Sequence, residues 1–161
     1  MVAGRVRDVG EPGGGGVSDT FLKDLHEGWA QLLAADGIGL TYPADPANGV
    51  GIYMLALPQT PDQLVSLSIS PMHADPTQAE SEFNLQVMCR SAGEDPRDVL
   101  DLDSAIFNSL AGRFPVTLPN GIKVSELGFL SGGSGGQDAE SRWLWASRWQ
   151  FIAYRPSTYR H

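Results

Sequence analysis

The chain has 161 residues, of which 42% are hydrophobic and 19% charged, and its formal net charge at pH 7 is −8. This length suits one domain with a substantial core, and the composition is that of a globular protein rather than a disordered one. The acidity argues against general binding to nucleic-acid phosphates, which favours a basic surface. No apolar run reaches the roughly 18 residues that a membrane span needs.

The cysteine count and the N-terminal composition indicate the compartment in which the protein folds. Cys89 is the only cysteine, so a disulfide within the chain is impossible and a reducing compartment fits best. The N-terminus lacks the apolar core of a secretory signal, so we do not expect export by that route.

Residues 1–17 show no periodicity and include four consecutive glycines. We expect them to form a flexible arm that becomes ordered only against a partner. Arg5 and Arg7 are too few to make this arm a nucleic-acid-binding tail. Residues 18–161 are expected to form a single domain.

Hydrophobic periodicity predicts the elements of that domain in chain order. A helix is expected over residues 19–35, with Ser18 as its N-cap and Gly37 as its stop. Strands follow at 51–57, 64–70 and 82–90, each showing an apolar run or an alternation of apolar and polar residues. A second helix begins at the N-cap Asp95, with Pro96 in its first position, and ends before Gly112.

The last third of the chain predicts strands at 114–118 and 122–130 and a long aromatic strand within residues 137–160. The segment Ser-Gly-Gly-Ser-Gly-Gly at 131–136 is expected to be the flexible tip of the hairpin that leads into it. One face of the final strand carries Trp143, Trp145, Trp149 and Phe151, which we assign to the core. The whole pattern indicates an α+β domain with a mostly antiparallel sheet and two helices packed against it.

No catalytic or metal-binding constellation is found in the sequence. His26, His73 and His161 are neither clustered nor spaced like zinc ligands, and Cys89 lies on an apolar strand face. The glycine-rich segment lacks the Lys-Ser/Thr of a phosphate-binding loop. We therefore expect no enzyme activity, no cofactor and no metal. The aromatic strand with its interleaved arginines could also serve as a base-stacking platform for single strands, but a core role for its tryptophans is favoured.

Charge is distributed unevenly along the chain. Five carboxylates and one arginine lie between residues 94 and 103, whereas four arginines and no carboxylate follow from residue 142 onward. This asymmetry suggests that one surface meets another of opposite sign in a second copy of the chain, and ordinary solvated charges are an equal alternative. The candidate subunit interface comprises Glu94, Asp95, Asp98, Asp101, Asp103, Arg142, Arg148 and Arg155.

Two segments together resemble a family. In the first, a strand with Gln86 and Arg90 is followed by a short break, a helix start with Asp95, Pro96 and Val99, and a helix end with Leu110 and Gly112. In the second, the C-terminal hairpin carries Leu127, Gly128, Asp138, Arg142, Trp143, Arg148, Phe151, Arg155, Pro156 and Ser157. Over residues 18–160 this pattern resembles the tail terminator and minor capsid proteins of long-tailed bacteriophages. The arm at 1–17 and the glycine-rich segment at 131–136 depart from it.

The resemblance implies a non-enzymatic virion protein that assembles in the cytoplasm of a bacterial host. Such a protein forms a ring, typically a hexamer, that ends polymerisation of the tail tube and offers a surface to the head connector. Its partners would be copies of itself, the tail tube protein and a connector or neck protein. Double-stranded DNA would pass through the lumen without specific binding, and an acidic chain suits such a lumen. No membrane is involved.

Two other functions remain open. One is another head–tail joining or neck protein. The other is a small acidic chaperone or adaptor that binds a partner chain through the exposed face of its sheet.

Overall fold

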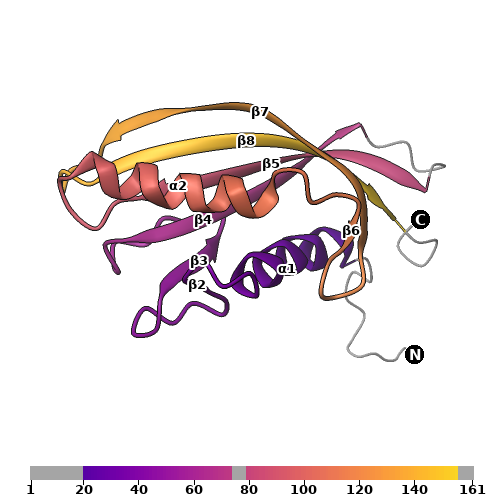
Figure 1. Ribbon diagram of the computed structural model, residues 1–161, viewed down its shortest axis with the longest axis horizontal. Coiled ribbons are helices and arrows are strands. Elements are labelled where there is room, and N and C mark those ends of the chain that lie inside the picture. Colours follow the sequence, from indigo (N-terminus) through magenta and orange to yellow (C-terminus); the bar gives the residue numbers. More distant parts are fainter. Residues whose placement is uncertain (1–19, 74–78, 156–161) are drawn as a thin grey trace, which may run out of the picture.

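The computed structural model describes residues 20–73 and 79–155 (Figure 1). The elements are two helices and seven strands: α1 (Phe21–Ala34), β2 (Leu40–Thr41), β3 (Val50–Met54), β4 (Leu64–His73), β5 (Glu80–Arg90), α2 (Pro96–Leu110), β6 (Val116–Thr117), β7 (Lys123–Gln137) and β8 (Trp143–Tyr154). Neither helix has the length and apolar character that crossing a lipid bilayer requires.

All seven strands belong to one curled sheet with the order β2-β3-β4-β5-β8-β7-β6. The pairs β2–β3 and β3–β4 are parallel, and every other pair is antiparallel. The expected α+β fold with a mostly antiparallel sheet is thus confirmed. The C-terminal strand β8 is central, because it pairs along its length with both β5 and β7.

The two helices begin in different ways. The side chain of Asp95 accepts a hydrogen bond from the Arg97 backbone N–H, so Asp95 is the N-cap of α2 as predicted, and Pro96 follows it. The first described helical residue of α1 is Phe21, after Thr20, whose side chain makes no capping bond. The predicted N-cap Ser18 lies outside the described residues.

Both helices pack on the same face of the sheet. Phe21 of α1 lies against Phe83 of β5, and Trp29 meets Phe151 of β8 edge to face at 5.0 Å between ring centroids. From α2, Phe107 packs on Trp149 of β8. These partners are odd-numbered residues of β5 and β8, so the odd-numbered face is the core face.

The assignment of the aromatic strand to the core is supported. Trp149 and Phe151 are buried, and Trp143 and Trp145 are partly buried against the same core cluster. Phe151 also stacks on Phe83 of the neighbouring strand, with 5.3 Å between centroids. Cys89 lies fully buried on this face, where burial raises the pKa of its thiol.

His26 also belongs to the core. The backbone N–H of Ile69 donates to its Nε2 at 3.0 Å, so its Nδ1 carries the proton and donates to the Leu22 carbonyl at 2.8 Å. This side chain therefore ties α1 to β4.

The glycine-rich segment at 131–136 is not a hairpin tip, and that prediction was wrong. It forms part of β7, in which Ser131 pairs with Arg148 and Ser134 with Trp145 of β8. The reversal comes later, where the Asp138 side chain accepts hydrogen bonds from the backbone N–H groups of Glu140 and Arg142.

The glycines have a structural reason within the strand. The register of β7 shifts between Ser134 and Gly136, and Gly136 has a φ of +78°, which favours glycine at such a bulge. A Cβ on Gly135 would lie only 3.1 Å from the Cβ of Leu144 on β8. Gly135 and Gly136 are thus explained by a close neighbour and a bulge rather than by a turn.

Candidate subunit interface

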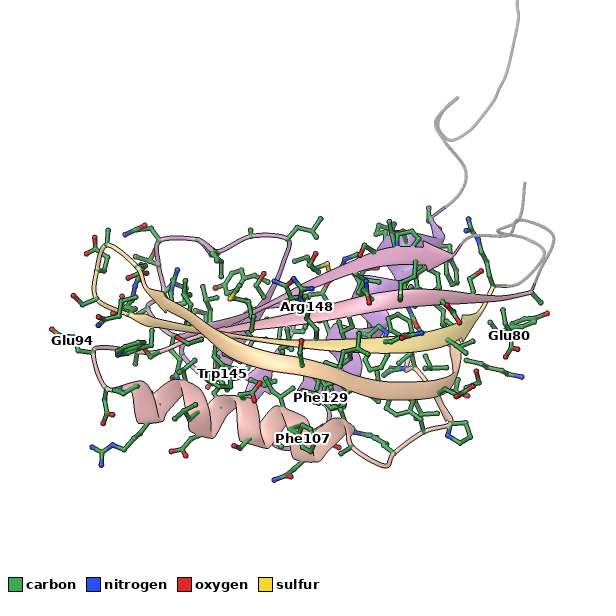
Figure 2. The ribbon with its side chains drawn as sticks, turned by 90° about the horizontal axis from the view of Figure 1, so that it is seen from above. Glu80, Glu94, Phe107, Phe129, Trp145 and Arg148 are labelled. Atoms are coloured by element: carbon green, nitrogen blue, oxygen red, sulfur yellow. The ribbon has the colours of Figure 1, made fainter. Side chains whose placement is uncertain are left out.

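The five carboxylates of the predicted interface all lie on α2 or at the start of that helix. Asp95, Asp98, Asp101 and Asp103 follow the helix from its N-cap, and Glu94 immediately precedes it at one end of the molecule (Figure 2). Glu94, Asp95 and Asp101 are exposed, whereas Asp98 and Asp103 are partly buried. The chain's local run of acidic residues therefore lies along one helix, on more than one of its sides.

Some of these charges already have partners within the chain. Arg97 pairs with Asp95 at 2.9 Å, and the side-chain and backbone hydrogen bonds from Arg97 lower the pKa of the Asp95 carboxyl. One carboxylate oxygen of Asp98 accepts from the Ala92 backbone N–H at 3.2 Å. The side chains of both residues of the Asp95–Arg97 pair are more than half exposed, so the pair contributes little to stability.

Asp103 differs from the others because it faces the sheet. Burial raises the pKa of its carboxyl, while Ser147 and Trp145 of β8, acting through their polar hydrogens, oppose that rise. Trp145 Nε1 and Ser147 Oγ are buried without a partner at standard hydrogen-bond geometry. No hydrogen bond of standard geometry therefore joins either group to the partly exposed carboxylate of Asp103.

Arg142 is buried within the subunit. Its Nε donates to Asp138 at 2.9 Å, and its Nη1 donates to Asp62 at 3.0 Å and to the Gln59 carbonyl at 2.8 Å. The side chain is 4% exposed. It joins the β7–β8 turn to the loop between β3 and β4, so its observed role is to hold the subunit together.

Arg90 performs a similar task beside it. Its guanidinium donates to the carbonyls of Pro58, Pro61 and Asp62 at 2.6–2.7 Å. Burial and the nearby positive charge of Arg142 lower the pKa of Arg90. Two buried arginines thus bind one loop mainly through its carbonyl oxygens, which suits the planar array of guanidinium donors.

Arg148 is exposed on the face of the sheet opposite the helices, which we call the open face (Figure 2). It lies in a row across three strands, opposite Gln86 of β5, which in turn is opposite Ser68 of β4. The neighbouring row contains Ser70, Asn84 and Gln150. The open face therefore presents a polar surface with a positive charge near its middle.

Arg155 lies at the far end of β8 from Arg142. Its guanidinium carbon sits 5.1 Å from the ring centroid of Phe21, a cation–π geometry. The three predicted arginines consequently lie in three separate places. The acidic residues form one cluster, but the arginines do not form a matching one.

The sequence indicated part of the open face and missed the rest. Alternation already placed Ser66 and Ser68, and likewise Asn84 and Gln86, on the polar sides of their strands. That some of them lie in one row with Arg148 depends on strand order and register, which could not be inferred from this single sequence. Among residues 20–73 and 79–155, no three His, Cys, Asp or Glu side chains converge as a metal site would require.

Comparisons with protein-family models and with curated proteins find no match for this sequence.

The Asp138 turn predicts an acid-dependent loss of stability. Burial opposes ionisation of this carboxyl, but its hydrogen bonds from the Arg142 and Glu140 backbone and its pairing with the Arg142 guanidinium lower its pKa overall. Because the folded pKa lies below the unfolded value of about 3.9, this stabilisation is present above that value and is lost as pH falls through the folded pKa. Asp138→Asn should flatten the decline in free energy of unfolding between about pH 5 and pH 3, measured by urea denaturation. An unchanged pH profile would show that Asp138 does not carry this dependence.

Proposed function

We propose that this protein is a tail terminator of a long-tailed bacteriophage, which closes the end of the tail tube as a ring of identical subunits and presents a surface to the head connector. The observation that carries the proposal is the unit formed by β5, the short break at 91–95 and α2. The residues on which the family resemblance depends occupy consistent places in that unit.

Gln86 and Arg90 lie on β5, Asp95 caps α2, and Val99 and Leu110 are buried on the inner side of that helix. In the C-terminal hairpin, Asp138 and Arg142 form the ion pair of the turn, and Phe151 is in the core. Apart from Gln86, on the open face, and Arg90, which binds the loop at 58–62, these residues fix a cap, a turn or a core contact. A shared architecture is a physical reason for such residue types to recur at these spacings.

The two charged surfaces support a head-to-tail ring contact. The acidic cluster lies along α2 on the helical side of the sheet, whereas Arg148 projects from the open face. Two different patches on opposite faces of one subunit suit a heterologous contact, in which one patch of each copy meets the other patch of the next. A two-fold contact would need both patches within one interface, which their positions on opposite faces disfavour.

Another head–tail joining protein is the second candidate, and an acidic adaptor is the third. The adaptor is favoured by one observation, the polar open face, which no helix of the described residues covers. Such a protein would form a small complex with a partner chain rather than a closed ring.

Reversing one charge tests the ring contact. Arg148→Glu, alone and together with Arg155→Glu, should lower the assembled mass measured by light scattering, because it removes the positive charge that faces the neighbour's acidic helix. Lys23→Glu, on the exposed side of α1, is the matched control and should leave the mass unchanged. Circular dichroism checks the fold, because Arg155 also contacts Phe21. If the double reversal of Arg148 and Arg155 leaves the assembled mass unchanged, the predicted interface is wrong.

Deleting the gene from its phage tests the function itself. A tail terminator is required to stop the tube, so electron micrographs of lysates should show tubes of uncontrolled length. Tails of normal length that fail to join heads would favour a head–tail joining protein. Normal virions would contradict both.

A further inference from the structure

The outer edge of β7 is a long sheet edge without a partner among the described residues. β6 pairs only with Lys123 and Val124, and no described strand lies beside residues 125–137. Backbone groups along such an edge are available to another strand. This is the most extensive unused feature of the described structure.

The usual protection of an edge is nearly absent here. Residues 127–137 contain no charged residue and no proline, although these are the residues that commonly block pairing with a second chain. Within residues 127–137, two shifts of register interrupt the pairing with β8, at Phe129/Ser131 and Ser134/Gly136. The side chains of Phe129 and Leu130 are 46% and 51% exposed. An edge of this kind is stable in solution when something covers it.

The side of α2 next to this edge presents partly exposed apolar side chains and one carboxylate. Phe107 meets Phe129 edge to face, with 5.3 Å between centroids, which fixes the side of α2 that faces β7 (Figure 2). Leu100 and Asp103 share that side at helical spacing. Leu100 is 43% and Phe107 38% exposed. We call Leu100, Asp103, Phe107 and Phe129 the α2–β7 patch.

Along α2, the side chains of this patch are apolar, acidic and apolar in turn. Asp103 stands between Leu100 and Phe107, and no arginine, lysine or histidine of the described residues pairs with it. A strand added to β7 would direct alternate side chains toward this flank. The strand that fits best has basic residues in the middle and apolar residues on each side.

The N-terminal segment of the chain has this order. Ala3, Arg5, Arg7 and Val9 alternate with Val2, Gly4, Val6 and Asp8, so in an extended strand Ala3, Arg5, Arg7 and Val9 would face one side. Residues 10–19, which include the four glycines, link this segment to the described structure and can span at most roughly 35 Å when extended.

We propose that residues 2–9 of one copy add a strand to the β7 edge of the neighbouring copy, with Arg5 and Arg7 on the side of Asp103 and with Ala3 and Val9 flanking them. The choice of a neighbouring copy rests on the proposed ring, in which every subunit both donates and accepts. Pairing of two β7 edges across a two-fold axis is less favourable, because it would supply no positive charge to either copy of Asp103.

Cross-linking between two full-length variants tests this arrangement. One variant carries Val6→Cys and the other Ser131→Cys, and a short bis-maleimide reagent joins thiols that lie close together. The native Cys89 is buried, so it contributes little background. Mixed variants should give a dimer containing one chain of each kind. Ala47→Cys replaces Ser131→Cys in the control, because residue 47 lies between β2 and β3, at the opposite edge of the sheet.

Charge reversal provides a second test of the same arrangement. Arg5→Glu with Arg7→Glu should lower the yield of the mixed dimer severalfold, whereas Lys23→Glu should leave it unchanged. A yield no higher than that of the Ala47→Cys control would overturn the proposal. Cross-linking of Ser131→Cys to itself would indicate paired β7 edges instead. A cross-link within one chain, seen when a Val6→Cys/Ser131→Cys double variant is diluted with unmodified protein, would place the segment on its own subunit.

The inference and the proposed function fail in different experiments. A ring of full mass without the mixed cross-link would exclude the strand exchange and leave the ring intact. A mixed cross-link in a protein whose deletion leaves phage tails normal would establish the exchange and exclude the terminator.

Discussion

The structure depends on β8, the strand that pairs on both sides and carries the central aromatic residues. Phe151 packs against Trp29 of α1 and Trp149 against Phe107 of α2, so one strand holds both helices on the same face of the sheet. Burying such rings is the largest favourable contribution available to a domain of this size. The same strand presents Arg148 to the opposite face. Side-chain alternation thus lets β8 bind the core with one face and offer a polar surface with the other.

The order of the elements could be predicted because each has a local cause. The cap at Asp95 and the alternation from Phe83 to Cys89 mark α2 and β5 without knowledge of the fold. Residues 131–136 were misassigned because glycine and serine favour turns by composition, whereas here the pairing with β8 decides the structure. Only the three-dimensional register shows that a bulge needs Gly136 and that Gly135 lies against Leu144.

The candidate interface could be predicted only in part, because contacts between distant segments of the chain also decide it. Carboxylates close together in sequence fall on one element here, α2 and its start, and local pattern was enough to place them there. The arginines of β8 lie on a strand that runs the length of the sheet, and their surroundings depend on other segments. Arg142 is buried because the loop at 58–62, eighty residues earlier in the chain, folds over it, and no local pattern reveals that contact.

Together these features describe a subunit with a well-packed core that is incompletely covered outside. Its buried arginines and histidine have partners within the chain. The β7 edge, the α2–β7 patch and the open face are left uncovered by the described residues. The most direct measurement is hydrogen–deuterium exchange of the full-length protein at low and high concentration. The account predicts that amides of residues 127–137 become protected as the protein assembles, while those of β2, at the opposite edge, remain unchanged. Equal exchange of residues 127–137 at every concentration would contradict it.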